Sequence, residues 1–215
     1  MDYIMYLPDG TETISTESFI DSYSEIYFKD YAKNDKERED DILRIIKKGR
    51  AIEPAEVITL MRWKTGDNNA DGDIVNCFGK HISLDIGQKV VNAVNSDMGQ
   101  DEMSMYQTLL SRQMSGLGTV YLLTLVWAIS GMKYPIYDKY ADIAISAICE
   151  NKRPDEIRDK YKQPPDKTQI KQVMEMYKQY QFQLTKVFGD GWKTRREIDQ
   201  ALWTYGHQKG TTWKR

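Results

Sequence analysis

The sequence has few of the residues that build disulfide frameworks and metal sites. Among its 215 residues are two cysteines, Cys77 and Cys149, and two histidines, His81 and His207. No CxxC pair occurs, so the sequence supports neither a disulfide framework nor a spaced zinc site. We therefore expect no metal site, and a reducing cytoplasm as the location.

Long hydrophobic runs are also missing. The start, MDYIMYLPDG, has no basic region followed by an apolar stretch, and the most apolar run, 117–132, is interrupted by glycine, serine and threonine. A transmembrane helix needs about 20 consecutive apolar residues. We expect neither secretion nor insertion into a membrane.

The composition is not extreme, because 40% of the residues are hydrophobic, 29% are charged and the formal net charge is −2. Such a chain folds, and we expect one compact helical unit over 1–215, although two small helical lobes would also fit this length. The charge is uneven. Residues 1–50 carry eight basic and twelve acidic side chains, whereas residues 186–215 carry seven basic and three acidic ones. The basic tail favours contact with phosphate, and a merely solvated charged surface is the alternative interpretation.

Hydrophobic spacing predicts a mainly α-helical protein. The first 15 residues differ, because they alternate loosely around Pro8-Asp9-Gly10, which indicates a short β-hairpin or an extended arm over 1–15. Beyond it, apolar residues recur at helical spacing between glycine and proline breaks. We expect one helix from Thr16, one around 42–46 that ends at Gly49, and further helices at 53–63, 84–95, 103–114, 119–130, 138–150, 168–188 and 194–205.

Turn-forming residues dominate 65–79, which we interpret as a loop. Four of its side chains stand at alternate positions, as at the start of a calcium-binding loop: Asp67, Asn69, Asp71 and Asp73. The twelfth position of that motif is a glutamate. Here it is Phe78, so we do not expect calcium.

Ser115-Gly116-Leu117-Gly118 joins two of the expected helices and predicts a tight hairpin. Glycines take backbone angles that other residues resist, and they leave amide N–H groups uncovered. Those amides lie at the start of the second helix, where unpaired donors and the helix dipole favour a phosphate. We expect Leu117 to pack the helices together and the hairpin to hold a nucleic-acid backbone without reading bases. An ordinary turn between core helices is the alternative.

The hairpin and the segment after it resemble the helix-hairpin-helix DNA glycosylase superfamily, in particular bacterial proteins of the 8-oxoguanine DNA glycosylase-like fold group. In that family a G-x-G hairpin and a proline-containing loop lead to an essential aspartate, and here Pro135 and Asp138 follow the hairpin. Further similar stretches lie at 61–66, 134–139 and 196–207. The resemblance implies a two-lobed helical glycosylase-like fold that binds duplex DNA through the hairpin, at Ser115, Gly116, Leu117, Gly118 and Thr119.

The resemblance also implies a catalytic role for Asp138. Cleavage of an N-glycosidic bond develops positive charge on the sugar, which a fixed carboxylate stabilises, and the same carboxylate can position or deprotonate the attacking water. Asp138 also directly precedes an amphipathic segment, where aspartate is favoured as a helix N-cap. The two roles are compatible.

One position departs from the family pattern. In bifunctional members a lysine directly follows the G-x-G-T segment and forms a Schiff base with the sugar, but here Val120 stands there. Valine is not a nucleophile, so we expect no strand-nicking through this position. Lys64, Lys133 and Lys139 could substitute from elsewhere, but surface positions suit them better.

A base that is rotated out of the duplex needs an aromatic or apolar pocket. The candidates are Val120, Tyr121, Thr124 and Trp203, although aromatic residues at helical spacing are more often part of a core.

The sequence thus predicts a monofunctional DNA N-glycosylase that hydrolyses the bond to a damaged or modified base, in DNA repair by base excision or in phage defence. Two alternatives remain: a non-catalytic helix-hairpin-helix nucleic-acid binding protein, and a helical interaction protein whose glycines serve packing only. The expected partner is DNA. We expect no membrane partner and no cofactor, apart from a monovalent cation that the hairpin could hold, and the sequence does not indicate an oligomeric state.

Overall fold

The computed structural model describes residues 3–32, 35–67, 69, 71–76, 78–96 and 98–208, so Cys77 lies outside the described residues. Within these ranges the chain forms ten α-helices and two small antiparallel strand pairs. The prediction of a mainly α-helical protein is confirmed. None of the helices in the described ranges has both the length and the apolar character needed to span a bilayer.

The chain divides into two compact units. Unit 1 comprises the described residues of Met1–Lys36, Tyr137–Pro164 and Glu175–Arg215, and unit 2 those of Glu37–Ile136 and Pro165–Met174. One long helix, α9 (Ile170–Phe188), begins in unit 2 and ends in unit 1.

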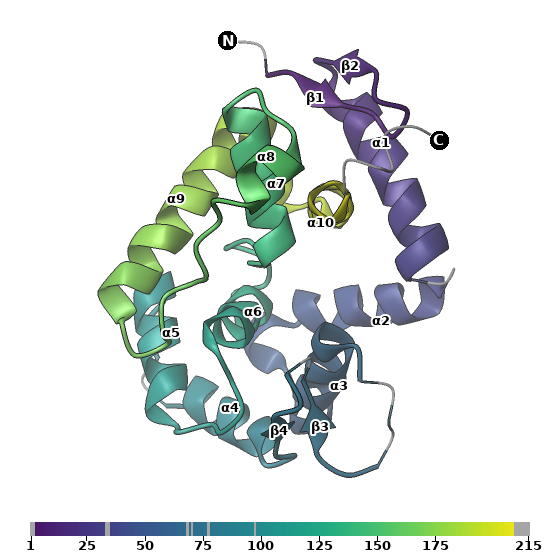
Figure 1. The fold of residues 1–215 in the computed structure, drawn as a ribbon. Coiled ribbons are helices and arrows are strands. Elements are labelled where there is room, and N and C mark those ends of the chain that lie inside the picture. The colour runs from purple at the N-terminus through teal and green to yellow at the C-terminus, as the bar shows by residue number, and fades with distance from the viewer. Residues whose placement is uncertain are drawn as a thin grey trace. The chain divides into compact units, whose positions relative to one another are not determined.

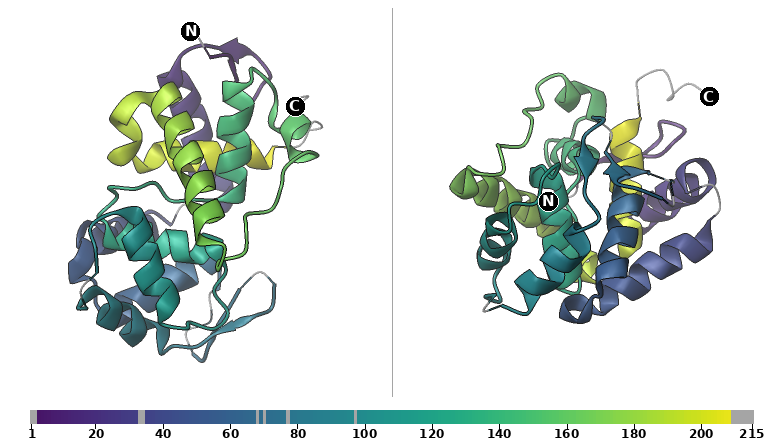
Figure 2. Two further views of the ribbon diagram at one scale, coloured as in Figure 1. Left: turned by 90° about the vertical axis from the view of Figure 1, so that its left-hand side faces the viewer. Right: turned by 90° about the horizontal axis from the view of Figure 1, so that it is seen from below.

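Unit 1 is built around α10, which packs against both α1 and α7 (Figure 1, Figure 2). The helices are α1 (Thr16–Ile26), α7 (Lys139–Cys149), the short α8 (Pro154–Arg158) and α10 (Arg196–His207). A π-helical turn, η1 (Tyr27–Tyr31), extends α1, and a 3-10 turn, η3 (Gly189–Lys193), follows α9.

The expected N-terminal hairpin is present. β1 (Met5–Tyr6) pairs antiparallel with β2 (Glu12–Thr13), with Met5 opposite Thr13. The turn between the strands is closed by Asp9, whose carboxylate accepts a hydrogen bond from the Thr11 amide at 2.9 Å. The loose alternation around Pro8-Asp9-Gly10 was therefore a correct signal for a hairpin.

The core of unit 1 is aromatic where α1 meets α10. Phe19 and Tyr23 recur four residues apart on α1 and are fully buried, because this spacing places both on one face of a helix. Each ring lies 5.2 Å, centroid to centroid, from the ring of Tyr205 on α10 in an edge-on arrangement. Such aromatic pairs contribute about 0.5–1.5 kcal/mol beyond the area that they bury.

The helices α10 and α7 approach each other most closely at Gly206. A Cβ atom at this position would collide with the backbone carbonyl oxygen of Tyr140, near the start of α7. Only glycine therefore allows this approach. Because of it, Trp203 and His207 on α10 reach the first turn of α7.

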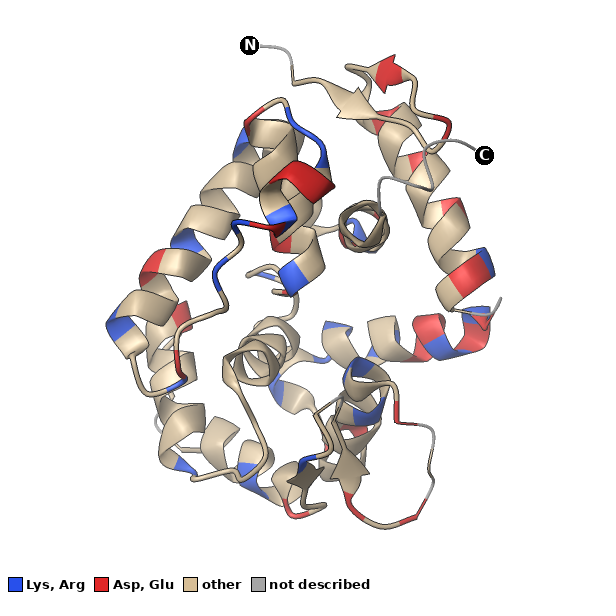
Figure 3. Cartoon of the chain, viewed as in Figure 1, with Lys and Arg blue, Asp and Glu red and all other residues tan. Residues whose placement is uncertain are grey.

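Unit 2 is built around α6 (Thr119–Ile129), in which ten of eleven residues are buried. This helix contains no charged residue, whereas α2 carries both signs of charge (Figure 3). The other elements are α2 (Lys36–Lys47), η2 (Gly49–Ala51), α3 (Pro54–Thr65), α4 (Ile86–Val94) and α5 (Glu102–Ser111).

The segment 65–79 is not only a loop, which corrects the prediction. Ile74 and Val75 form β3, which pairs antiparallel with β4 (His81–Ile82), and Ile74 stands opposite Ile82. Both isoleucines are buried. Two apolar residues among many turn formers are too few to show a period in the sequence, and the pairing becomes visible only when the partner strand is known.

We expect Gly206→Ala to destabilise unit 1, because the added methyl group meets backbone and not the movable end of a side chain. Overpacking of this kind costs about 1–3 kcal/mol, which urea or guanidinium unfolding would measure. Gly191→Ala is the matched control, since the nearest atom to a Cβ there is the Ile198 Cδ1, 3.7 Å away, an ordinary contact. Equal unfolding free energies for the two variants would contradict the close approach.

Candidate active site and nucleic-acid hairpin

The connection between α5 and α6 covers 112–118 and is longer than the predicted four-residue hairpin, because α5 ends at Ser111 and not at 114. Gln113 takes a left-handed φ of 50°, which ends the helical run before the glycines. Leu117 is buried, in agreement with the prediction that it packs the helices together.

The two glycines of the hairpin have different roles, which corrects the prediction that both take angles other residues resist. Gly116 has a φ of 77°, and a Cβ there would collide with the carbonyl oxygen of His81. Gly118 has ordinary extended angles, φ −96° and ψ −179°, and no atom lies within 4 Å of its Cβ position. Gly116 is therefore required by the fold, whereas Gly118 is the N-cap of α6 and leaves the start of that helix uncovered.

The amides at the start of α6 have no backbone acceptor in the part of the chain that the structure describes. No backbone N–H between 116 and 120 donates a hydrogen bond to any residue that the structure describes. The Thr119 hydroxyl, in contrast, donates to the carbonyl oxygen of Pro165 at 2.6 Å. Uncovered amides at a helix N-terminus, together with the helix dipole, favour an anion.

Asn76 fastens the turn between β3 and β4 to this hairpin. The Asn76 side chain is buried and donates from its Nδ2 to the carbonyl oxygen of Gly116 at 3.2 Å. Its Oδ1 accepts from the amides of Phe78 and Lys80, at 2.9 and 3.0 Å. The turn thereby presents Phe78, whose side chain is 79% exposed. Nothing in the sequence pointed to Phe78 beyond its place among turn formers.

Asp138 is the N-cap of α7. Its Oδ1 accepts a hydrogen bond from the Tyr140 amide at 2.9 Å, and its backbone is extended, with φ −141° and ψ 144°. The capping role that the sequence left open is confirmed. Asp138 is partly exposed, so its carboxylate combines a fixed position with access to solvent.

Four rings gather beside the start of α7, and we refer to Tyr31, Tyr140, Trp203 and His207 as the aromatic cluster. The His207 ring lies 3.4 Å from that of Tyr140 and 3.8 Å from that of Trp203, centroid to centroid. Tyr31 at the end of η1 lies 4.6 Å from Trp203 and is 45% exposed. Trp203 was predicted as a base-pocket residue, whereas Tyr31, Tyr140 and His207 were not.

His207 is held as a neutral imidazole. Its Nδ1 lies 2.9 Å from the carbonyl oxygen of Trp203, which can only accept, so the Nδ1 carries the proton. Burial lowers the pKa of His207, and the Trp203 carbonyl and the negative charge of Asp138 partly oppose that effect. In this state the Nε2 is an acceptor. Arg158 holds the end of α10 by donating to the carbonyl oxygens of Gly206 and Gln208, both at 2.6 Å.

The remaining predicted pocket residues lie on α6 in unit 2. Thr124 is fully buried, and its hydroxyl donates to the Val120 carbonyl at 3.0 Å. Tyr121 is buried and Val120 is partly exposed. The predicted residues thus fall into two groups: the hairpin and the α6 positions in unit 2, and Asp138 with Trp203 in unit 1.

The acidic loop before β3 is organised by its own hydrogen bonds. Asp67 accepts from the Asn69 and Val75 amides, both at 3.0 Å, and pairs with Arg62 at 3.2 Å. These hydrogen bonds lower the pKa of Asp67, and the one from the Asn69 amide has the largest effect. In the described residues no group of three or more histidine, cysteine, aspartate or glutamate side chains is placed to hold a metal ion.

No protein-family model, curated protein or solved structure matches this chain. Any assignment of function therefore rests on its residues and their geometry.

The lowered pKa of His207 predicts a loss of stability in mild acid. In the unfolded chain the imidazole takes up a proton near its ordinary pKa of 6.5, before the folded protein does. The unfolded state then binds more protons, so the free energy of unfolding falls as the pH falls through this window. His207→Gln should remove this part of the loss. Urea unfolding of both proteins at several pH values would measure it.

The matched control is His81→Gln at the exposed second histidine. Equal losses of stability by the wild type and His207→Gln between neutral and mildly acidic pH would contradict the conclusion that the folded protein holds His207 as a neutral imidazole.

Proposed function

We propose that this protein is a monofunctional DNA N-glycosylase, which hydrolyses the glycosidic bond of a damaged or modified base. The observation that carries the proposal is the Asp138 carboxylate, fixed at the start of α7 beside the aromatic cluster. A carboxylate beside a cluster of aromatic rings combines the two requirements of this reaction: stabilisation of a cationic sugar and a surface for a base.

Asp138 suits the electrostatic part of the reaction. The bond to the base breaks with positive charge on the sugar, and a carboxylate that is already positioned stabilises that charge without reorganising. The hydrogen bond from the Tyr140 amide provides the positioning. The same carboxylate can orient the attacking water and accept its proton.

The aromatic cluster suits the base. Every nucleobase has a π-face, and stacking on an aromatic side chain is worth about 1–3 kcal/mol. Tyr31 is 45% exposed and Trp203 is partly exposed, and the Nε2 of His207 offers an acceptor to an N–H group of a base. Partial exposure of these rings makes them candidates for stacking, while the pair at Tyr140 and His207 supports them.

The hairpin suits the DNA backbone. The amides of 116–120 have no acceptor among the described residues, and Gly118 places no side chain over them. Phe78 adds an exposed ring on a turn that Asn76 holds against the hairpin. Apolar side chains in such positions insert between base steps and help to unstack them.

The absence of an amine nucleophile at 120 makes the proposed activity monofunctional. Lys139 lies over the rings of Tyr140 and Tyr161, at 5.6 and 5.8 Å from their centroids, and Lys133 lies 5.2 Å from the centroid of Tyr134. Both amines thus lie against aromatic rings of this chain, which suits surface lysines better than nucleophiles. Water is therefore the proposed attacking group.

A second candidate is a non-catalytic nucleic-acid binding protein. It is favoured by the cap at Asp138, because that hydrogen bond gives the aspartate a structural reason to be there. In this case only the hairpin of unit 2 would be functional. Retained salt-dependent DNA binding without release of any damaged or modified base would select this candidate.

We expect Asp138→Asn to slow base release by about 100-fold or more, as for loss of a general acid–base or electrostatic group. Asparagine is an equally good N-cap, so the fold and the affinity for DNA should be unchanged. Single-turnover assays on duplexes with assorted damaged or modified bases would measure the rate, and gel shifts the affinity. A wild-type rate in this variant would remove Asp138 from the mechanism.

We expect Gly118→Asp to weaken DNA binding without weakening the fold. Aspartate at the N-cap of α6 stabilises the helix, but its carboxylate accepts hydrogen bonds from the amides and its charge repels a phosphate. The salt dependence of binding should decrease, because one phosphate contact is lost. Gly118→Asn is the control, since asparagine caps the helix without a charge and should weaken binding less. Unchanged affinity and salt dependence in Gly118→Asp would contradict the hairpin assignment.

A further inference from the structure

A polar network lies one turn beyond Asp138 on α7, in which Tyr137 is fully buried and Asp142 and Tyr161 are partly buried. The hydroxyl of Tyr137 lies 2.7 Å from Asp142 Oδ2, and the hydroxyl of Tyr161 lies 3.2 Å from the same atom. The two hydroxyls lie 2.8 Å from each other. Three oxygen atoms from the loop before α7, from α7 itself and from the connector after α8 thus form a closed triangle.

The triangle needs three protons. Each tyrosine hydroxyl supplies one, so an ionised Asp142 would leave one of the three contacts without a hydrogen between two electron-rich oxygens. A protonated carboxyl group supplies the third hydrogen. Each oxygen then donates once and accepts once, in the order Asp142 to Tyr161 to Tyr137 to Asp142.

The surroundings of Asp142 disfavour its charge. Among the described residues no lysine, arginine or histidine pairs with it. Burial raises the pKa of Asp142, the two tyrosine hydroxyls partly oppose this, and the negative charge of Asp138 raises the pKa further. Desolvation of a carboxylate without a cation is unfavourable, and protonation avoids it.

The titratable groups on the elements packed around Asp142 are Asp138 and Lys139 on α7, Tyr161 in the connector, Tyr177 and Tyr180 on α9, Arg158 on α8 and His207 on α10. Of the two cations, Lys139 and Arg158, Lys139 comes nearest to the network, because it lies over the ring of Tyr161. Arg158 and Asp138 both influence the pKa of His207, beside the start of α7.

We propose that Asp142, Tyr137 and Tyr161 form a closed ring of hydrogen bonds in which Asp142 keeps its proton at neutral pH, and that this ring positions Asp138. The positioning role rests on the function proposed above for Asp138. The ring holds Tyr137, directly before Asp138, and Asp142, one helical turn after it. The Asp142 amide donates to the Asp138 carbonyl oxygen at 2.9 Å. A neutral Asp142 also leaves Asp138 without a like charge one helical turn away.

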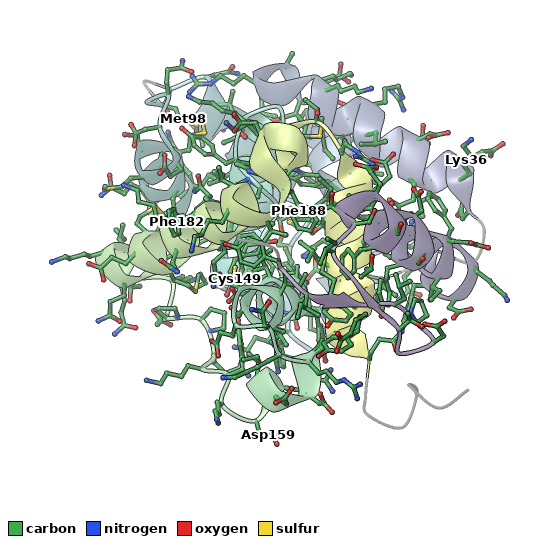
Figure 4. The ribbon with its side chains drawn as sticks, turned by 90° about the horizontal axis from the view of Figure 1, so that it is seen from above. Lys36, Met98, Cys149, Asp159, Phe182 and Phe188 are labelled. Atoms are coloured by element: carbon green, nitrogen blue, oxygen red, sulfur yellow. The ribbon has the colours of Figure 1, made fainter. Side chains whose placement is uncertain are left out.

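The proton on Asp142 can be observed directly in the full-length protein. Infrared or carbon NMR spectra of protein labelled at the aspartate carboxyl carbons should show a protonated carboxyl group at pH 7. The signal should vanish in Asp142→Asn and persist in Asp159→Asn, which removes an exposed aspartate of the same unit (Figure 4). A wild-type spectrum without a protonated carboxyl group at pH 7 would overturn the proposal, whatever the activity of the protein.

Stability supplies a second readout with a defined sign. In the unfolded chain Asp142 loses its proton near 3.8, whereas the folded protein keeps it to higher pH. The folded state then binds more protons, so the contribution of Asp142 to the free energy of unfolding falls as the pH rises through this window. Asp142→Asn lacks that loss, and its stability relative to the wild type should increase with pH. A pH-independent difference would mean that Asp142 ionises normally.

Base release tests the positioning role. Asp142→Asn keeps only part of the ring, because the amide atom at the position of Oδ2 either only accepts or only donates, and it should slow base release less than loss of the polar group does. Asp142→Leu cannot form the ring and should slow release at unchanged DNA affinity. Equal rates for the leucine variant and the wild type would refute the positioning role. A protein that releases no base at all would refute the proposed function and this role with it, while the spectra alone decide whether Asp142 carries a proton.

Discussion

The close approach of α10 to α7 at Gly206 is the contact on which the candidate site of unit 1 depends. It places the rings of Trp203 and His207 against Tyr140, whose own amide fixes Asp138. A bulkier residue at 206 would push the two helices apart and separate the carboxylate from the rings. The site therefore owes its geometry to the absence of one methyl group, although glycine is a poor helix former by about 1 kcal/mol.

Residues that carry the proposed chemistry also hold the fold together in both units. Asp138 caps α7, and the start of α6 is left open because its cap is a glycine. Conservative substitutions separate the two contributions, since asparagine preserves a cap while it removes a charge. At Asp142 asparagine removes the ability to ionise, but it also replaces an oxygen that can both accept and donate by an atom that does only one of these.

The sequence was sufficient for most of the helices and for the cap at Asp138, because apolar spacing and cap residues are local signals. It also directed attention to Trp203. It could not indicate the role of Gly206 or the ring around Asp142, since Tyr161 lies 19 residues beyond its partner. Helical spacing shows which face of a helix is buried, but not against what. The strands β3 and β4 were missed because β3 stands among many turn-forming residues, so no alternation is visible there.

The Asn76 side chain makes hydrogen bonds both within the turn between β3 and β4 and to the hairpin of unit 2. One side chain therefore attaches the turn to the hairpin. Asn76 makes the hydrogen bonds that hold the backbone there, whereas the side chain of Phe78 is largely exposed. A designer could exchange Phe78 for other large or small side chains and keep the scaffold unchanged. The side chain at position 78 could in this way be changed to alter selectivity for a ligand, without altering the hydrogen bonds that Asn76 makes to the hairpin.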